Sequence, residues 1–351
     1  MEQPQPLQPI AWHRSPTDRQ LLGRLTRKGD WPGLVQTLGF LGVLVLTGGT
    51  AYYSGEHWPW YATLPLLLVH GTCWAFVSNG FHEFSHRTVF ATPWLNEAFL
   101  GLFSFMSWIN PVLFWASHTE HHKSTLYSGR DLEIDVEARP TLRGFLLDAF
   151  VNLRGLYRTA SMNMRHAFGR LEGEWEEHLF PASNPELKRR LARAARILLL
   201  AQAAVIGIAA YFHLWMLIMV VSFARFYGGG IQWLCNEAQH CALPGDVDDF
   251  RLCSRTIHLN PVLRFMYWHM NYHIEHHQYA AVPCYRLARL HEALKYDMPA
   301  STRGLIATWR QIDAILQRKA SEPGYKYWTP VPQRTLRARL GSVPAAARSV
   351  T

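Results

Sequence analysis

Four long stretches without a charged residue constrain this chain most, because each reaches or exceeds the roughly 20 residues that cross a hydrocarbon core. They cover residues 34–53, 58–81, 98–117 and 197–224. The 35 Lys and Arg of the 351-residue chain are gathered between these stretches. This segregation predicts an integral membrane protein of the all-α class rather than a soluble enzyme.

The first two stretches predict a transmembrane hairpin with spans at about 34–53 and 58–81. The tip of this hairpin holds no Lys or Arg but gathers aromatic residues, namely Tyr52, Tyr53, Trp58, Trp60 and Tyr61. Basic residues precede the first span: Arg14, Arg19, Arg24, Arg27 and Lys28. Because cytoplasmic flanks carry the excess of positive charge, the N-terminal segment (1–33) and the end of the second span are expected in the cytosol.

The two later stretches, 98–117 and 197–224, each allow more than one arrangement. Asn110-Pro111 interrupts residues 98–117, which we expect to form a re-entrant or interfacial segment rather than a span. From Ile197 to Cys235, Arg225 is the only charged residue. This region is compatible with one long helix or with a hairpin that turns near 211–213, which would give spans at about 193–211 and 214–235.

The polar segments read as cytosolic helices that cap a membrane domain covering residues 34–320. Residues 321–351, rich in Pro and Arg, are expected to form a flexible C-terminal tail. The net charge of +9 could suggest nucleic acid. The basic residues flank apolar stretches, however, as expected for contact with anionic lipid, and we predict no nucleic-acid partner.

Half of the 18 histidines fall in four clusters. The clusters are His82-Glu-Phe-Ser-His86, His118-Thr-Glu-His121-His122, Asn236-Glu-Ala-Gln-His240 and His273-Ile-Glu-His276-His277. Residues at i, i+3 and i+4 share one face of a helix, so we expect each cluster to aim its imidazoles at one point. Nine imidazoles exceed the six positions of one octahedral ion, which implies at least two metal ions. Nitrogen ligation suits iron, copper, zinc or nickel.

Neutral imidazoles leave the charge of the metal ions uncompensated, so we expect carboxylates to accept hydrogen bonds from the ligating rings. The candidates are Glu83, Glu120, Glu275, Asp131, Glu133 and Asp135. His269, four residues before His273, is expected on the same helical face and near the site. The histidines without partners in sequence are expected to be ordinary polar residues: His70, His166, His178, His213, His258 and His291.

The motifs HEFSH, HTEHH, NEAQH and HIEHH, in this order between hydrophobic hairpins, resemble those of the membrane fatty acid desaturase and hydroxylase superfamily, over about residues 30–300. The resemblance implies a di-iron centre on the cytosolic side of four transmembrane helices, with an acyl chain entering a bent tunnel. It also implies that Asn236 binds iron through water. Transferred by position, the implied iron ligands are His82, His86, His118, His121, His122, His240, His273, His276 and His277.

The first motif has three residues between its histidines, as in many bacterial members, whereas acyl-CoA desaturases have four. The substrate of those enzymes is therefore not carried over. If all clusters meet at one centre, an even number of membrane crossings must separate any two of them. Two hairpins satisfy this condition, which favours the hairpin reading of residues 193–235.

These observations together predict an oxygen-dependent desaturase of a fatty acyl or lipid chain, using Fe²⁺ ions with O₂ as co-substrate. It would be a multi-pass membrane protein, of the inner membrane if bacterial, with its active site on the cytosolic side. No flavin, haem or cysteine iron-sulfur motif occurs in the sequence. External electrons are therefore expected from a ferredoxin, rubredoxin or cytochrome.

Two alternatives stay open. One is a hydroxylase or ketolase of the same superfamily, acting on an alkyl, carotenoid or small amphiphilic substrate. The other is a membrane metal transporter, which predicts metal ligands inside the spans rather than at helix ends.

Overall fold

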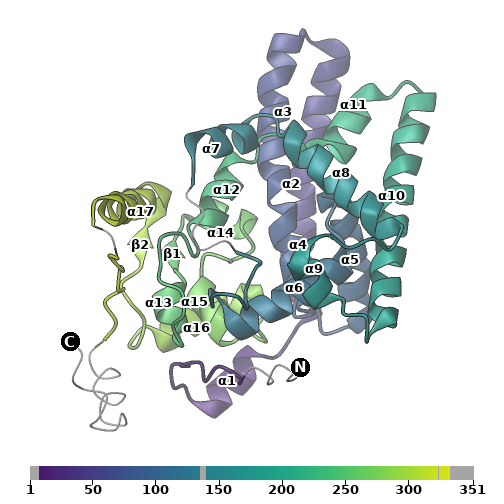
Figure 1. Ribbon diagram of the computed structural model, residues 1–351. Coiled ribbons are helices and arrows are strands. Elements are labelled where there is room, and N and C mark those ends of the chain that lie inside the picture. Colours follow the sequence, from purple (N-terminus) through teal and green to yellow (C-terminus); the bar gives the residue numbers. More distant parts are fainter. Residues whose placement is uncertain (1–7, 135–139, 323, 333–351) are drawn as a thin grey trace, which may run out of the picture.

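The computed structural model describes residues 8–134, 140–322 and 324–332. The chain is mostly helical, as expected for the all-α class (Figure 1). The helices of the first half are α1 (Arg19–Leu25), α2 (Asp30–His57), α3 (Trp60–Ala75), α4 (Val77–Ser85), α5 (Pro93–Ser107), α6 (Pro111–Ser124), α7 (Leu142–Ala149), α8 (Leu153–Ala167) and α9 (Gly173–Leu179). Those of the second half are α10 (Pro185–Tyr211), α11 (Trp215–Leu217), α12 (Gly230–Glu237), α13 (Phe250–Cys253), α14 (Pro261–Met266), α15 (His273–Gln278), α16 (Leu287–Leu294) and α17 (Gly304–Ser321).

Short irregular helices and one small strand pair complete the described fold. They are a π-helix η1 (Ile218–Ser222), the 3₁₀-helices η2 (Ala224–Phe226) and η3 (Cys284–Arg286), and the strands β1 (Ile257–His258) and β2 (Thr302–Arg303). The strands pair in parallel, with Ile257 opposite Thr302. This two-residue pair is a small addition to the expected all-α class.

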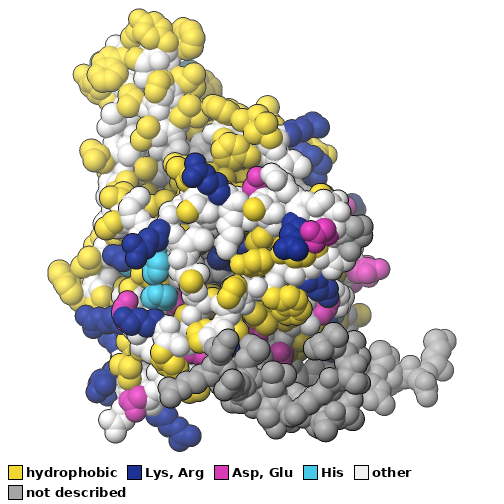
Figure 2. All heavy atoms as spheres, turned by 90° about the vertical axis from the view of Figure 1, so that its left-hand side faces the viewer, with side chains coloured by type: hydrophobic (Ala, Val, Ile, Leu, Met, Phe, Trp, Pro, Cys, Tyr) yellow, Lys and Arg dark blue, Asp and Glu magenta, His cyan; other side chains and the backbone are white. Residues whose placement is uncertain are grey.

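The first expected hairpin is present as α2 packed along α3, which continues into α4 (Figure 1). Its tip and flanks are apolar and exposed, as Figure 2 shows at the top of the molecule. His70 lies buried between the arms, where its Nδ1 is 2.9 Å from Thr47 Oγ1 and its Nε2 is 2.8 Å from the carbonyl oxygen of Val220. This side chain therefore links α2 and α3 to η1.

The apolar stretch 98–117 is broken where the sequence predicted. Trp108 adopts a left-handed conformation (φ 60°) at the end of α5, and Asn110 Oδ1 then accepts hydrogen bonds from the backbone N–H groups of Val112 and Leu113 at the start of α6. Pro111 occupies the first turn of α6, where its missing N–H costs nothing. The two helices consequently meet at 99°.

The chain reverses after α10, near the turn expected at residues 211–213. His213 has a positive φ of 57°, and the following segment returns along α10. The return arm is not the single helix expected for 214–235 but a succession of α11, η1, η2 and α12. Gly228 (φ 72°) packs so tightly against α3 that an added Cβ would lie 2.7 Å from the Thr72 backbone nitrogen. The close contact and the glycine conformation interrupt the helix there.

Three helical segments within the described residues are long and apolar enough to cross a membrane: Asp30–His57, Trp60–Ser85 and Pro185–Tyr211. The bent pair α5–α6 raises that number to four if it counts as one span. These segments include the expected spans at 34–53, 58–81 and 193–211. The expected span at 214–235 is not among them, because its helix is interrupted.

Helices α13, α15 and α16 lie at one end of the two hairpins, and the N-terminal segment binds to this end (Figure 1), whereas α8 runs along α10. Trp12 stacks on Phe250 with ring centroids 4.0 Å apart. The backbone N–H of Ser15 donates to Gln278 Oε1, next to the last histidine cluster. The tail expected at 321–351 lies largely outside the described residues, which end at 332.

Candidate metal centre

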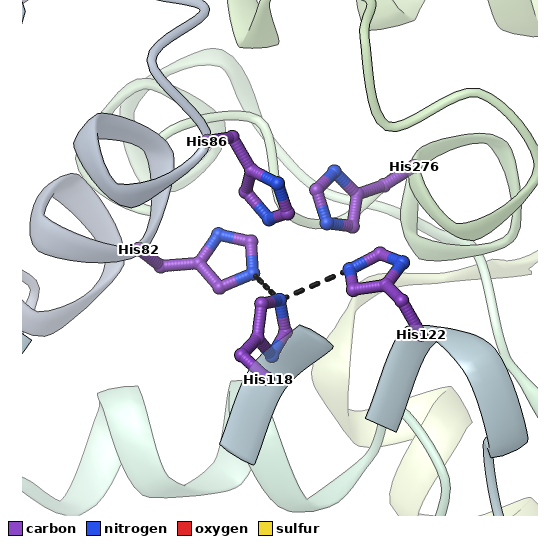
Figure 3. A group of neighbouring side chains, drawn as sticks. All are labelled: His82, His86, His118, His122 and His276. Atoms are coloured by element: carbon purple, nitrogen blue, oxygen red, sulfur yellow. Dashed lines mark hydrogen bonds between the residues drawn. The ribbon is translucent and has the colours of Figure 1, made fainter. Parts of the chain in front are cut away.

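Nine histidines from four distant parts of the chain meet at the end of the hairpins, and they are the nine singled out in the sequence. The nitrogen atoms that they offer form two groups, and within each group these atoms all lie within 4.8 Å of one another. The first group, drawn in Figure 3, consists of His82, His86, His118, His122 and His276. The second consists of His121, His240, His273 and His277. Each group could hold a metal ion.

The clusters do not each aim at one point, which corrects a prediction made from spacing. His118 and His122 of α6 belong to the first group, whereas His121 belongs to the second. In α15 the i, i+4 pair His273 and His277 belongs to the second group, and His276 faces the first. Residues three and four positions along a helix are rotated in opposite directions, by about 60° and 40° at 3.6 residues per turn. One short helix therefore serves two sites.

The Nε2 atoms of several rings face one another across distances typical of hydrogen bonds. His118 Nε2 lies 2.7 Å from His82 Nε2 and 3.0 Å from His122 Nε2. In the second group, His273 Nε2 lies 2.8 Å from the Nε2 of His240.

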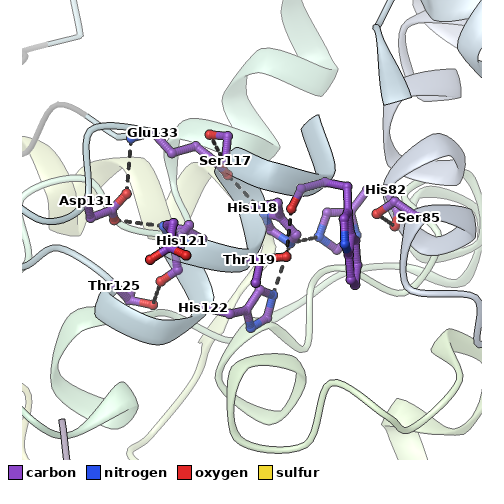
Figure 4. Close-up of polar contacts among 12 residues, drawn as sticks. His82, Ser85, Ser117, His118, Thr119, His121, His122, Thr125, Asp131 and Glu133 are labelled. Atoms are coloured by element: carbon purple, nitrogen blue, oxygen red, sulfur yellow. Dashed lines mark hydrogen bonds and ion pairs between the residues drawn. The ribbon is translucent and has the colours of Figure 1, made fainter. Parts of the chain in front are cut away.

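Acceptors on the other side of these rings fix which nitrogen carries the proton (Figure 4). His118 Nδ1 donates to Glu133 across 2.9 Å, and His121 Nδ1 donates to Asp131 across 2.8 Å. His240 Nδ1 donates to the carbonyl oxygen of Cys253 across 2.7 Å. A neutral ring that donates through Nδ1 presents a lone pair at Nε2. Facing lone pairs repel each other unless a cation lies between them, so the donor set fits metal ions.

Burial keeps most of these imidazoles neutral, but not His121. Burial opposes the charged form of His121 as well, yet its hydrogen bond to Asp131 raises its pKa above the usual value. Burial lowers the pKa of His240 to about 3, with a further contribution from nearby His121. Burial and then the neighbouring imidazoles hold the pKa of His273, His276 and His277 well below the usual histidine value. Neutral rings can bind a metal ion without first losing a proton.

Of the five expected carboxylates that the structure describes, three contact histidines of the groups and two do not. Glu83 contacts His82 Nδ1 at 3.0 Å, and Asp131 and Glu133 bind the rings described above. Burial opposes the ionisation of Asp131, but its hydrogen bond to His121 leaves its pKa below the usual value. Glu120 instead forms an exposed pair with Lys123. Asp135 lies outside the described residues.

Glu275 is fully buried but contacts none of the nine rings through a hydrogen bond among the described residues. It accepts hydrogen bonds from Thr256 Oγ1 (2.6 Å) and from His291 Nδ1 (2.5 Å). Burial disfavours the charged imidazole, yet the bond to Glu275 raises the pKa of His291. His291, expected to be an ordinary polar residue, thus holds the carboxylate next to His276 in the chain.

Asn236 lies in α12, and its Oδ1 accepts a hydrogen bond from Asn79 Nδ2 across 3.1 Å. His269 is placed differently from the prediction. It lies in the turn between α14 and α15 with a φ of 58°, so it does not share a helical face with His273. Burial, and then Arg264, lowers its pKa to about 4.

Several polar residues that support the centre were missed in the sequence. Ser117 Oγ donates to Glu133 (2.6 Å), and Trp175 Nε1 donates to Ser117 Oγ (3.2 Å). Thr125 Oγ1 lies 3.3 Å from His277 Nδ1. Asn79 could have been noticed, because it precedes His82 by three residues and so shares its helical face. The others come from separate segments and carry no spacing signal.

Two cavities border the histidines. One of about 760 Å³ lies between the N-terminal segment, α6 and α9, and His86, His118, His122 and His277 line part of it. The other, of about 510 Å³, is bordered by His82, His118, His121, His240 and His273, together with residues of α4 and α12. A small molecule can therefore reach both groups.

Comparison with known proteins places the nine histidines inside a region shared with a known protein family. A family model described as fatty acid desaturase matches residues 57–309, a region that contains all nine histidines. A protein of Oryza sativa subsp. japonica, described as sphingolipid delta(4)-desaturase DES1-like, is 25% identical over 217 residues. The matched region covers 60% of this chain and 57% of that protein, so the chain spans little more than half of this relative's length.

Proposed function

The chain belongs to the fatty acid desaturase family, and from this premise we propose that it is an oxygen-dependent membrane enzyme that introduces a double bond into the hydrocarbon chain of a lipid. The observation that carries the proposal is the pair of histidine groups with facing Nε2 atoms. The similarity to a relative described as a sphingolipid desaturase supports a lipid substrate.

Two iron ions are the proposed cofactor. One would be held by His82, His86, His118, His122 and His276, and the other by His121, His240, His273 and His277, the two groups that lie close together. Asn236 would contribute through a water molecule. Bound iron supplies the capacity to reduce oxygen and to remove hydrogen from an unactivated C–H bond. Iron fits the all-nitrogen donor set, which does not suit calcium or magnesium.

The protein's own residues would orient the rings and exclude water. Asp131, Glu133 and Glu83 hold three of the imidazoles by Nδ1, which leaves Nε2 free for the metal. Most of the nine side chains are buried, so the reacting carbon would enter a site from which bulk water is removed. The cavity of about 510 Å³, which borders both groups, supplies the space for this carbon.

Desaturation with O₂ needs electrons beyond those of the substrate. Two electrons and two protons come from the C–H bonds, and two more of each are required to reduce O₂ to two water molecules. We propose that a ferredoxin, rubredoxin or cytochrome supplies the second pair of electrons. The excess of basic residues on the protein suits an acidic carrier.

We also propose four crossings, made by α2, by α3 with α4, by α10 and by the interrupted arm 214–235, with α5–α6 as a re-entrant segment. Residues 34–320 would then form one membrane domain, with 1–33 as a cytosolic segment and 321–351 as a tail. The histidines would lie at the cytosolic side. In support, α7 and α8 expose apolar residues beside arginines, as helices at a membrane surface do: Leu142, Arg143, Leu153, Arg154, Tyr157 and Arg158.

Anaerobic purification followed by iron analysis and lipid mass spectrometry tests the proposal. We expect two irons per chain and, in a host that expresses the protein, lipids lighter by two hydrogen atoms. His276→Ala should abolish this change, whereas His57→Ala, an exposed histidine at the far tip of α2, should not. A product heavier by one oxygen atom would identify a hydroxylase instead. Metal bound without any oxygen consumption would refute the proposed enzyme.

A further inference from the structure

The cavity of about 510 Å³ is lined by a wall of polar side chains in addition to the histidines. Its lining includes hydroxyl and amide side chains from α4, α12 and the residues after α12: Ser78, Asn79, Gln232, Asn236 and Gln239. Charged residues complete this wall, namely Asp148, Arg225 and Glu237. A site for a hydrocarbon chain alone would be lined by apolar groups, so this wall suits a polar part of a ligand.

Arg225 is the most unusual residue of the wall. It is half-buried in η2, within the arm that returns along α10. Among the residues that the structure describes, its guanidinium forms no hydrogen bond and no ion pair, and Asp148 acts on it only from beyond ion-pair distance. Removing a charged group from water is costly unless hydrogen bonds replace the lost hydration. The guanidinium of Arg225 therefore has N–H donors that no described side chain uses, and these donors are open to the cavity.

Acceptors also line the same cavity. The side chain of Glu237 forms no hydrogen bond with a described residue, and Asp148 Oδ1 accepts one from Asn152. One cation faces two carboxylates, so the wall is not a positive pocket. An anionic headgroup would meet both carboxylates, whereas a neutral group with donors and acceptors could bind Arg225 and Glu237 together.

The surroundings of the cavity suit a ligand that arrives from lipid. Asp148 belongs to α7, which lies beside α12 (Figure 1). Apolar residues are exposed at both ends of α7: Leu142 at its start is 72% accessible, and Phe150 directly after its end is 56% accessible. A lipid in contact with these residues would be close to the polar wall, to which the same helix contributes Asp148.

We infer that this cavity binds the uncharged, hydrogen-bonding headgroup of the lipid substrate, one that carries hydroxyl and amide groups, with Arg225 and Glu237 as the recognition residues. Because the same cavity borders both histidine groups, the reacting carbon would lie near the headgroup rather than deep in the chain. This inference rests on the proposed function and narrows its substrate class.

Equilibrium binding to the full-length protein in detergent tests the inference without iron or turnover. The probes are radiolabelled N-hexadecanoylethanolamine, which carries an amide and a hydroxyl, and hexadecanoic acid, which has the same acyl chain with a carboxylate. We expect the neutral probe to bind at least about tenfold more tightly, equivalent to about 1.4 kcal/mol. Arg225→Gln should weaken binding of the neutral probe about tenfold, because the acceptors of this probe lose their donor. Arg310→Gln, on the exposed side of α17, is the matched control.

Glu237→Gln provides a second variant in case Arg225→Gln does not fold. It should weaken binding of the neutral probe and reduce the preference, because it removes a carboxylate that repels the anionic probe. Equal affinity for both probes in the wild type, or an unchanged affinity for the neutral probe in both cavity variants, would overturn the inference. Iron content and oxygen consumption of the same preparations report on the proposed function separately. A wild type that binds iron and consumes oxygen but shows no headgroup preference would refute the inference alone.

Discussion

Asn79 Nδ2 donates a hydrogen bond to Asn236 Oδ1 across 3.1 Å and so joins the helix of the first histidine cluster to the helix that precedes His240. Gln232 Nε2 in turn lies 3.4 Å from Asn79 Oδ1. The oxygen of Asn236 is thus occupied, and its NH₂ group remains available to a water molecule beside the histidines. The two asparagines act as a unit that orients Asn236.

Replacing Asn79 by leucine, which has a similar size, should therefore release Asn236. We expect product formation per folded protein to fall about tenfold. Iron content should stay near that of the wild type, because Asn79 does not belong to either group of candidate metal ligands. Stability should fall by about 1–3 kcal/mol, since a buried acceptor loses its donor. Asn163→Leu is the control, because Asn163 is equally buried and hydrogen-bonded but lies in α8. It should lose stability without losing turnover.

Asp131→Asn should weaken binding of one iron selectively. Asp131 holds His121, which belongs to the second histidine group, and loss of such a partner typically lowers metal affinity 10–100-fold. A timed chelator challenge that follows released iron should therefore show one fast and one slow ion in this variant. Glu120→Gln, at an exposed pair with Lys123, should match the wild type. Equal release of both ions from Asp131→Asn would contradict the assignment.

His70→Phe should destabilise the membrane hairpins and spare the metal centre. Phenylalanine fills the space but leaves Thr47 Oγ1 and the carbonyl oxygen of Val220 without their buried partner. We expect a loss of about 1–3 kcal/mol, visible as a lower thermal unfolding temperature in detergent. The number of bound irons should not change. His57→Phe, at the exposed hairpin tip, should unfold at the wild-type temperature.

The contact between α8 and α9 should depend on pH. Burial opposes the ionisation of Glu176, but His166, at 3.0 Å, and the backbone N–H of Glu172 lower its pKa below the usual glutamate value. A lowered folded-state pKa contributes stability that is fully present above the unfolded-state pKa and is lost as the pH falls through the folded value. The wild type should thus be more stable than Glu176→Gln at neutral pH, by about 1 kcal/mol, and this difference should vanish in acid. Unfolding temperatures of both proteins across a pH series measure it.

Much of the centre follows from local patterns along the chain. The spacing of His118, His121 and His122 indicates a helix that presents imidazoles, and the Asn110-Pro111 pair indicates where the preceding apolar stretch must break. Both features are present because helix periodicity and proline geometry act over a few residues. The interruption of 214–235 was not predictable in this way. The arm already changes to π and 3₁₀ geometry at residues 218–226, and its last break depends on the packing of Gly228 against α3, a segment more than 150 positions away.

Local chemistry in the chain was therefore sufficient to single out nine imidazoles and the apolar segments that carry them. Their division into five and four, the choice of Asp131 rather than Glu120 as a histidine partner, and the cavity beside Arg225 arise only when distant helices pack together. Helical rotation sends neighbouring histidines in different directions, and what stands opposite each ring is set by the three-dimensional arrangement of segments that are remote in the chain.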